Sequence, residues 1–330
     1  MSVPLLELQE VRKHYRLGNS LLDRVARRQR RLLALDGVSL TVYEGEVLGL
    51  VGESGSGKST LAQVAVRLTD VTAGRVRYRG EDLTHTEGRA LRPFRERVQM
   101  VFQDTGSSLN PRKTIGTTLR EALAMRGVPK PERTQHSLRL LELVGLADFV
   151  LPRLPHQLSG GQRQRVAIAR SLAMQPEFLV ADEPVASLDV SLQAQIVNLL
   201  LKLRDELGLT LLFISHDLAL VNRISTRVAV MYAGHVVEQG LPDDVLRRPA
   251  HPYTQALLGA VPRGVAGRNA PRDPLPGGPP DPANLSDGCH FAPRCPRAQA
   301  VCHARYPARQ QLSDVHMASC HFATTILESP

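Results

Sequence analysis

The 330-residue sequence predicts an α/β fold with a mostly parallel core sheet. Two near-continuous apolar runs, "FLVADEP" (178–184) and "LTLLFISHD" (209–217), end in acidic or polar residues, as central parallel strands do. A shorter apolar run over 47–51 leads into the glycine-rich segment 52–60, after which the periodicity becomes helical up to Leu68. Strands that alternate with helices in this way are typical of α/β folds.

The other expected elements complete this pattern. In chain order they are a strand over 5–17, two strands joined at Glu44-Gly45, a strand over 97–104, helices from about 111 to 174, a helix over 193–208 that ends at Gly208, and a hairpin over 227–240 that turns at Ala233-Gly234. These elements place a sheet and its covering helices within the first 248 residues.

Composition sets limits on the class of protein. Hydrophobic residues make up 42% of the chain, which is enough for a sizeable core. The net charge of +9 suits nucleic acid, anionic lipid headgroups or polyphosphate ligands. No apolar stretch approaches the roughly 18–20 residues that span a bilayer, and the N-terminus has no signal-peptide profile. We therefore expect a cytosolic protein or one that other proteins attach to a membrane.

A change in composition divides the chain. Residues 262–288 are rich in Pro, Gly, Asp and Asn and predict an extended linker. We expect a main domain over 1–248, with a helical part at about 104–172, and a C-terminal extension over 249–330. The Arg-rich insertion 20–31 predicts a solvated loop between two strands, or alternatively a contact with a membrane surface or partner.

The segment "GESGSGKST" fits the pattern G-x-x-x-x-G-K-[ST]. Its glycines let successive backbone N–H groups point inward around phosphate oxygens, and the following helix adds its positive N-terminal end. The lysine is expected to reach the β- and γ-phosphates, and the hydroxyl after it to bind Mg²⁺. The predicted phosphate-site residues are Gly52, Ser54, Gly55, Gly57, Lys58, Ser59 and Thr60.

An acidic pair ends the predicted strand at 178–184. Asp182 is placed to hold Mg²⁺, directly or through water, and Glu183 to polarise an attacking water molecule. Alone, such a pair is also an ordinary acidic strand end. Together with the glycine loop, it indicates nucleotide hydrolysis.

The segment "LSGGQRQRVAIAR" (158–170) predicts a second anion-binding helix start, with Arg163 and Arg165 on the helix. Read in isolation, its serine and glycines also fit a simple helix cap. Because the first loop already holds the γ-phosphate, we expect the second site to serve the nucleotide of another subunit.

These segments together resemble the nucleotide-binding subunits of ATP-binding cassette (ABC) transporters. "GESGSGKST" resembles the Walker A loop, "LSGGQ" the family signature and "FLVADEP" the Walker B strand, in the family's order over roughly residues 5–248. The resemblance implies an ABC-type α/β P-loop ATPase with a mostly parallel core sheet, an antiparallel β subdomain, a helical subdomain and a small C-terminal extension.

The resemblance also implies roles for single residues. Gln103 matches the Q-loop glutamine, Ser187–Asp189 the D-loop, His216 the switch histidine, and Tyr15 the aromatic that stacks on adenine. Glu183, His216 and Gln103 are then the catalytic group, and Mg²⁺ binds Ser59, Gln103 and Asp182. The residues that contact the partner subunit's ATP are Ser159, Gly160, Gly161 and Gln162.

Three further segments resemble a narrower group, the ATPases of oligopeptide and dipeptide importers. They are "FQDTGSSLNPR" (102–112), "HPYTQALLGAVP" (251–262) and "GCHFAPRCPRA" (288–298). The resemblance implies a peripheral protein on the cytoplasmic membrane face that hydrolyses ATP to power peptide uptake. It implies as partners a second ATPase subunit, expected to be a different chain, two membrane permease subunits and an extracytoplasmic solute-binding protein. Another solute, such as nickel, is an alternative.

Two other classes of function each fit part of the sequence. A soluble cassette ATPase acting on ribosomes or DNA would suit the basic charge, but the chain has neither two cassettes nor a long coiled coil, so no nucleic-acid partner is expected. A non-hydrolysing regulatory cassette is disfavoured because Lys58, Gln103, Glu183 and His216 are all present.

All four cysteines, Cys289, Cys295, Cys302 and Cys320, lie in the last 42 residues with the spacing C-x₅-C-x₆-C-x₁₇-C. Disulfides are disfavoured in a reducing compartment, and the C-x₂₋₄-C knuckle common in structural zinc sites is absent. The spacing leaves a Cys₄ iron–sulfur cluster, zinc and free thiols open. The resemblance of the tail to peptide-importer ATPases implies a [4Fe–4S] cluster, and the histidines nearby keep zinc as the alternative.

Overall fold

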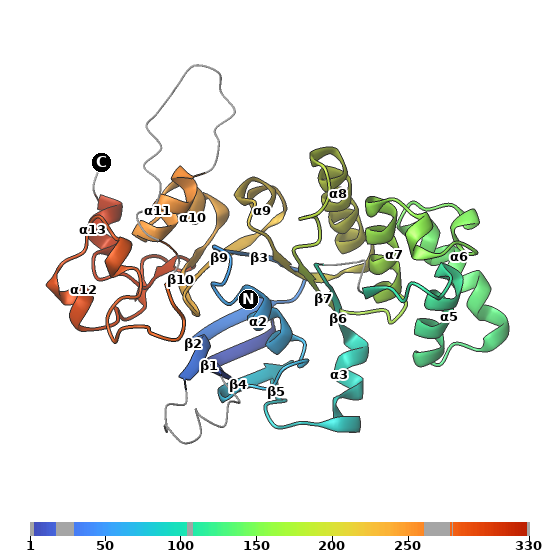
Figure 1. Ribbon diagram of the computed structural model, residues 1–330, viewed down its shortest axis with the longest axis horizontal. Helices are drawn as coiled ribbons and strands as arrows, with labels where there is room; N and C mark the ends of the chain where they lie inside the picture. The colour runs from blue at the N-terminus through green and yellow to red at the C-terminus, as the bar shows by residue number, and fades with distance from the viewer. Residues whose placement is uncertain (1–2, 18–29, 104–107, 261–277, 279, 329–330) are drawn as a thin grey trace, which may run out of the picture. The chain divides into compact units, whose positions relative to one another are not determined.

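The computed structural model describes residues 3–17, 30–103, 108–260, 278 and 280–328 (Figure 1). It divides into two compact units. The first unit comprises Met1–Pro4, Tyr43–Val47 and His85–Ser215, and the second comprises Leu5–Val42, Leu48–Thr84 and His216–Pro330. Most of the Arg-rich insertion and most of the expected linker lie outside the described residues.

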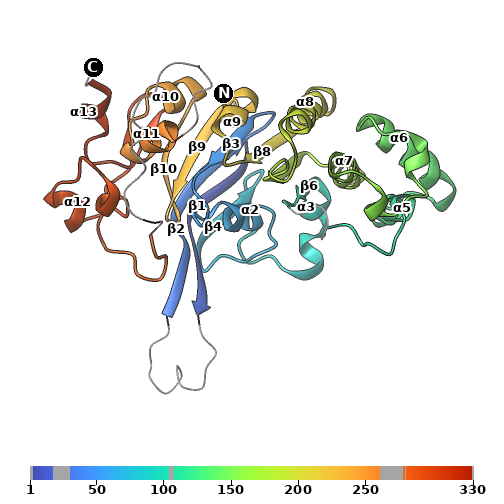
Figure 2. The same cartoon turned by 45° about the horizontal axis from the view of Figure 1, so that its top comes forward.

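The second unit contains an antiparallel sheet with the strand order β2-β1-β4-β5. Two long strands dominate it and run side by side in Figure 2. The strands are β1 (Pro4–Leu17), β2 (Arg30–Tyr43), β4 (Ala73–Tyr78) and β5 (Glu81–Asp82). Leu8 on β1 lies opposite Val76 on β4, and both side chains are buried. This sheet is the expected antiparallel β portion.

The second unit also contains the strands that precede and follow the glycine loop. Strand β3 (Val47–Val51) pairs in parallel with β9 (Arg227–Tyr232), and β9 pairs antiparallel with β10 (His235–Gly240). The hairpin between β9 and β10 turns at Ala233-Gly234, as predicted. Four helices accompany these strands: α2 (Lys58–Ala65), α9 (Leu218–Ile224), α10 (Pro242–Arg247) and α11 (Pro252–Gly259).

The C-terminal extension adds strands to the outer edge of β10. Strand β12 pairs antiparallel with β10 and with β11, so that Glu238 lies opposite Ala318. The buried side chains Ala250, Ala318, Cys320, Ala323 and Ile326 form a small core of their own. The elements are η5 (Ala292–Arg294), α12 (Ala300–Ala304), β11 (Gln310–Gln311), β12 (Met317–Ala318) and α13 (Ala323–Glu328). This pairing was not predicted from the sequence.

The first unit contains three parallel strands in the order β8-β7-β6 and a group of helices. The strands are β6 (Val98–Val101), β7 (Phe178–Asp182) and β8 (Thr210–Ile214); every residue of β7 and β8 is buried. The α-helices are α3 (Arg92–Arg97), α5 (Ile115–Met125), α6 (Arg133–Leu143), α7 (Gly160–Leu172) and α8 (Val190–Leu207). Short 3₁₀ turns occur at Gly88–Leu91, Lys130–Glu132, Asp148–Val150 and Pro155–Gln157.

Side chains at the helix starts explain where these helices begin. Thr114 accepts a hydrogen bond from the Thr117 N–H at the start of α5, and Asp189 accepts one from the Leu192 N–H at the start of α8. Helix α8 ends at Gly208, whose φ of 66° continues the chain in the left-handed region. The predicted helix end at Gly208 is therefore confirmed.

The α/β class is confirmed, with parallel pairs (β3-β9, β6-β7 and β7-β8) beside antiparallel ones, and α5, α6 and α7 fall within the predicted helical part. The boundaries at 1–248 and 249–330 remain a prediction. In the described parts of the chain, no helix combines the length and hydropathy needed to cross a bilayer.

Candidate functional site

The glycine loop connects β3 to α2 within the second unit, as predicted. Gly57 caps the helix start with a φ of 104°, a conformation that favours glycine. A Cβ atom at Gly52 would overlap the carbonyl oxygen of Met231, and one at Gly57 would overlap that of Ala34. The loop therefore curls tightly against the neighbouring backbone, and a glycine-rich curl of this kind is the shape of a polyphosphate cradle.

Lys58 lies inside this loop and is only 5% exposed. Its ammonium group donates to the carbonyl oxygens of Gly52, at 2.8 Å, and Glu53, at 2.9 Å. The surrounding residues differ in exposure: Ser54, Gly55 and Ser59 are exposed, and Thr60 is half-buried. The loop thus holds a positive charge at its centre, with the Ser59 side chain accessible beside it.

The acidic strand end lies in the first unit. Asp182 is the last residue of β7 and is 5% exposed, while Glu183 follows in the left-handed region with a φ of 44°. The Glu183 N–H donates to the carbonyl oxygen of Ile214 at 3.0 Å. The Gln103 amide Nε2 lies 3.2 Å from Glu183 Oε2 and donates to it. Two of the three predicted catalytic side chains are therefore brought together.

The signature segment forms the start of α7. Ser159 Oγ accepts a hydrogen bond from the Gln162 N–H at 3.3 Å, and Gln162 Oε1 accepts one from the Ser159 N–H at 3.0 Å. Ser159 is exposed, Gly160 and Gln162 are half-buried, and Gly161 is buried. The segment is therefore a capping box, the simpler of the two interpretations, and its exposed serine is also available to a ligand.

The two arginines of α7 are bound within their own unit. The Arg163 guanidinium donates to the carbonyl oxygen of Leu158 at 2.7 Å, and that of Arg165 donates to Val144 at 2.6 Å. Arg165 also contacts the Gln195 side chain. The guanidinium groups of both arginines therefore bind backbone carbonyl oxygens near the helix.

The remaining predicted residues are accessible. The exposed Asp189 accepts hydrogen bonds from the Leu192 N–H and the Ser191 hydroxyl, which lower the pKa of its carboxyl group. His216 is exposed and precedes α9. The Tyr15 side chain on β1 is 37% exposed, with the Lys13 ammonium 5.2 Å from its ring centroid. An exposed ring is what stacking on an adenine requires.

The four cysteines of the extension line one small cavity, together with His251, Phe291 and His321 among others. Its accessible volume of about 20 Å³ is that of a single water molecule or ion. Burial raises the pKa of Cys289 and of Cys295, and raises that of Cys320 to about 11, so these thiols are neutral without a bound cation. Within the described residues, no group of three or more His, Cys, Asp and Glu side chains has metal-binding geometry.

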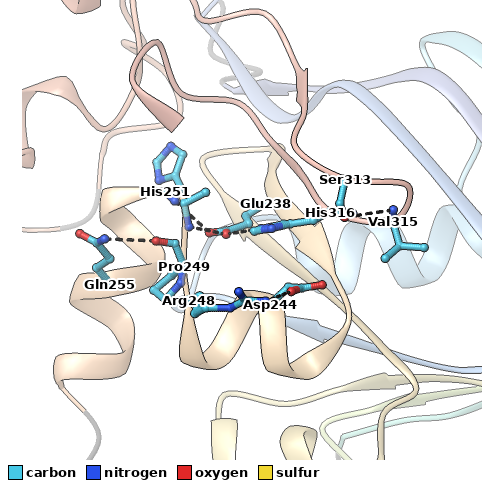
Figure 3. Close-up of polar contacts among 10 residues, drawn as sticks. Glu238, Asp244, Arg248, Pro249, His251, Gln255, Ser313, Val315 and His316 are labelled. Atoms are coloured by element: carbon cyan, nitrogen blue, oxygen red, sulfur yellow. Dashed lines mark hydrogen bonds and ion pairs between the residues drawn. The ribbon is translucent and has the colours of Figure 1, made fainter. Parts of the chain in front are cut away.

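Two contacts of the extension were not predicted from the sequence. Arg294, next to Cys295, forms a bidentate ion pair with Glu53 of the glycine loop. Glu238 on β10 is buried and bound by His316 and by two backbone N–H groups, as Figure 3 shows. No local pattern pairs residues this far apart in the chain, and Arg294 is one of several arginines in the cysteine-bearing segment.

The comparisons with known proteins agree with this arrangement. The sequence model of the ABC transporter family matches residues 35–186. The sequence model of the oligopeptide/dipeptide transporter C-terminal region matches residues 237–302. A Brucella ovis protein named as a peptide import ATP-binding protein is 45% identical over 96% of this chain and 97% of its own length. A similarly named Brucella abortus protein is 50% identical over 88% and 86% of the two chains.

Solved structures give the same result. A dimeric ATP-binding cassette in a post-hydrolysis state with ADP and Pi has a TM-score of 0.63 and 30% identity, covering 72% of this chain and 99% of that one. A component of an ABC transporter complex from Clostridium perfringens has a TM-score of 0.63 and 28% identity, covering 74% and 91%. The chain therefore belongs to the ABC transporter family, as one of its ATP-hydrolysing subunits. Its C-terminal part is of the kind found in oligopeptide and dipeptide transporters.

Proposed function

We propose that this chain hydrolyses ATP in an importer complex that takes up oligopeptides or dipeptides across the cytoplasmic membrane. The observation that carries the proposal is that one chain combines the phosphate loop at 52–60 with an extension of the oligopeptide/dipeptide transporter type at 237–302. The similarly named relatives match nearly the whole chain and support the same solute class.

The proposed roles follow from the chemistry of each side chain. The backbone N–H groups of 52–60 and the Lys58 ammonium bind the phosphates, and the exposed Tyr15 ring stacks on adenine. Ser59, Gln103 and Asp182 hold Mg²⁺, which when bound neutralises phosphate charge. Glu183 accepts the proton of the attacking water.

Gln103 and His216 complete the proposed catalytic group. The hydrogen bond from Gln103 fixes one carboxylate oxygen of Glu183. The exposed His216 ring can donate a hydrogen bond to the γ-phosphate. Both residues orient the groups that react, and neither forms a covalent bond in the reaction.

The partners follow from the same proposal. Two ATPase subunits, which we take to be different chains, place the signature of each against the nucleotide of the other. The exposed Ser159 and the N–H groups at the start of α7 supply that contact. Two permease subunits and an extracytoplasmic solute-binding protein complete the complex, and the ATPase is peripheral on the cytoplasmic face.

We further infer that the four cysteines hold a [4Fe–4S] cluster, with zinc as the alternative. Four thiols around one cavity are a suitable donor set. The cavity as it stands has room for about a single ion, so a cluster requires the thiols to move apart. Such a centre would cross-link a segment whose own apolar core is small, and it needs no redox role.

Reconstitution of the complex in liposomes tests the proposed function. The chain is purified with the membrane proteins that accompany it, and ATP turnover is measured with peptides, with Ni²⁺ or with neither. Turnover and uptake that depend on peptides support the proposal. Dependence on Ni²⁺ alone assigns another solute, and copurification with ribosomes in place of membrane proteins overturns the transport function.

A further inference from the structure

The extension contacts the phosphate loop through the side chains of Tyr253 and Arg294. Arg294 ends the short turn η5, and its side chain is 8% exposed. Its Nη1 lies 2.8 Å from Glu53 Oε2 and its Nη2 lies 3.0 Å from Glu53 Oε1. Both carboxylate oxygens are therefore bound by one planar guanidinium, a geometry that lysine cannot reproduce.

Glu53 is held at three points, all within the second unit. Its N–H donates to the Tyr253 hydroxyl at 2.8 Å, its carbonyl oxygen accepts from the Lys58 ammonium at 2.9 Å, and its carboxylate binds Arg294. The position of Glu53 therefore affects the backbone of the loop and the ammonium group that binds phosphate. A change at Arg294 acts on that same position.

An aromatic cluster contacts Arg294 through the Tyr232 ring. The rings of Tyr232, Tyr253 and Phe291 pack with centroids 4.5–5.5 Å apart, and all three side chains are buried. Arg294 also donates to the Tyr232 hydroxyl at 3.3 Å. Because packing holds the guanidinium in one orientation, the Arg294 side chain does not have to be ordered each time that ATP binds.

The pair also has an electrostatic consequence for the loop. A carboxylate in a loop that binds polyphosphate would repel the ligand, and burial reduces the screening by water. Arg294 neutralises this charge. Loss of Arg294 alone leaves the Glu53 carboxylate unpaired beside the phosphates, whereas removal of both charges does not.

We propose that Arg294 is a positioning residue for ATP binding, which acts through Glu53 on the geometry and charge of the phosphate loop. The inference rests on the proposed role of residues 52–60 in ATP binding. It makes the cysteine-bearing extension a working part of the nucleotide site, because Arg294 lies on the same turn as Cys295.

The test measures the affinity of the full-length chain for a fluorescent ATP analogue, and KM and kcat for ATP in the reconstituted complex. Arg294→Met should weaken ATP binding about tenfold and raise KM with a smaller change in kcat, since hydrogen bonds to charged groups are among the stronger ones. Arg294→Lys keeps the charge but loses the fork, and should weaken binding about threefold. Glu53→Gln combined with Arg294→Met should recover most of the affinity.

Two controls separate the possible failures. Arg309→Met removes an arginine of the same extension that binds the Ser39 carbonyl oxygen, and should leave ATP affinity unchanged. Lys58→Ala should abolish binding; if it does not, the proposed ATP site itself is wrong. Suppose that Lys58→Ala abolishes binding but a folded Arg294→Met chain binds ATP like the wild type. The inference is then overturned. If the methionine variant does not fold, Arg294→Lys takes its place in this comparison. Equal losses in the single and double variants would also overturn it, because they would indicate a purely structural role.

Discussion

The Gln103 amide donates a hydrogen bond to the Glu183 carboxylate, with Nε2 and Oε2 3.2 Å apart. Strand β6 leads to Gln103, and β7, its parallel neighbour, leads to Glu183. Parallel strands end at the same edge of a sheet, which is why residues separated by 80 positions meet. This contact fixes one oxygen of the Glu183 carboxylate.

Replacement of Glu183 by glutamine should preserve ATP binding and lower hydrolysis by about 10²–10⁴-fold, because the amide keeps the shape but cannot accept a proton. The nucleotide-bound dimer should then accumulate. Turnover is measured in a complex whose partner ATP site is also disabled. Near-normal turnover in that complex would contradict the proposed role of Glu183. Glu177→Gln, at a surface pair with Arg97, is the matched control.

Substitution of Ser159 should impair the partner subunit's site and spare this chain's own ATP binding. Ser159→Arg removes the helix cap, which costs about 1 kcal/mol, and fills the exposed position with a long side chain. Ser159→Asn keeps a capping side chain and should be much milder. ATP binding to the isolated, folded chain is compared with turnover at the partner site. Loss of binding by the isolated Ser159→Arg chain would contradict the proposed contact across subunits.

Protein purified without oxygen should contain iron and sulfide and show visible absorption if the cysteines hold a cluster. Cys302→Ser should remove the metal and lower the midpoint of thermal unfolding, because the extension would lose its cross-link. His303→Ala, an exposed neighbour, should leave the metal content unchanged. Colourless protein with stoichiometric zinc rules out the cluster, and a folded extension without metal rules out both centres.

His235 should make the protein less stable in mild acid. Burial, the His290 ring and the Arg12 guanidinium lower the pKa of His235 to about 3, even though Asp36 lies 3.6 Å away and the Tyr306 ring stacks on it. As the pH falls, the His235 ring gains a proton near pH 6.5 in the unfolded chain, but it stays neutral at that pH in the folded chain. Stability is therefore complete above pH 6.5 and falls toward pH 3, by at most about 1.4 kcal/mol per pH unit.

Denaturant unfolding at several pH values checks this prediction. His235→Asn should unfold with a shallower loss of stability between pH 6.5 and 4.5 than the wild type, since it lacks the titrating ring. The exposed His85→Asn should have the slope of the wild type. Identical slopes for His235→Asn and the wild type would show that His235 is not held neutral in the fold.

Glu238→Ala should destabilise the protein by about 3 kcal/mol or more, because it leaves buried donors without an acceptor. Glu238 Oε1 accepts from the Ala250 N–H at 2.7 Å and lies 2.8 Å from His316 Nε2, and Oε2 accepts from the His251 N–H at 3.1 Å (Figure 3). Asp243→Asn, in an exposed pair with Arg247, should cost less than about 1 kcal/mol. Similar unfolding free energies for the two variants would contradict this account.

Local patterns allowed the sequence to predict much of the fold. The strand, loop and helix over 47–65 could be recognised because apolar runs and glycine spacing are read within a few residues. The end of helix α8 at Gly208 and the hairpin turn at Ala233-Gly234 could be predicted for the same reason, because each depends on only a few neighbouring residues. These signals also identify the residues of the candidate site, because each motif is local.

Contacts between distant segments could not be predicted in this way. The pairing of Arg294 with Glu53 spans 241 positions, and the binding of Glu238 by His316 spans 78. Each depends on how the extension folds onto earlier strands, which no periodicity encodes. The backbone partners of Arg163 and Arg165 could not be predicted for a related reason, since the charges are visible in the sequence but the carbonyl oxygens that they bind are not.

The pairing of β12 with β10 also covers a strand edge on which another chain could otherwise add a strand. Strand β10 is bound by β9 on one side and by β12 on the other. A chain shortened before residue 310 would leave the N–H and C=O groups along that second side of β10 without these partners, and such a row is a template on which another chain can add a strand. Truncation of the extension is therefore expected to yield aggregates whatever its effect on ATP, and single substitutions are the cleaner way to learn what the extension does.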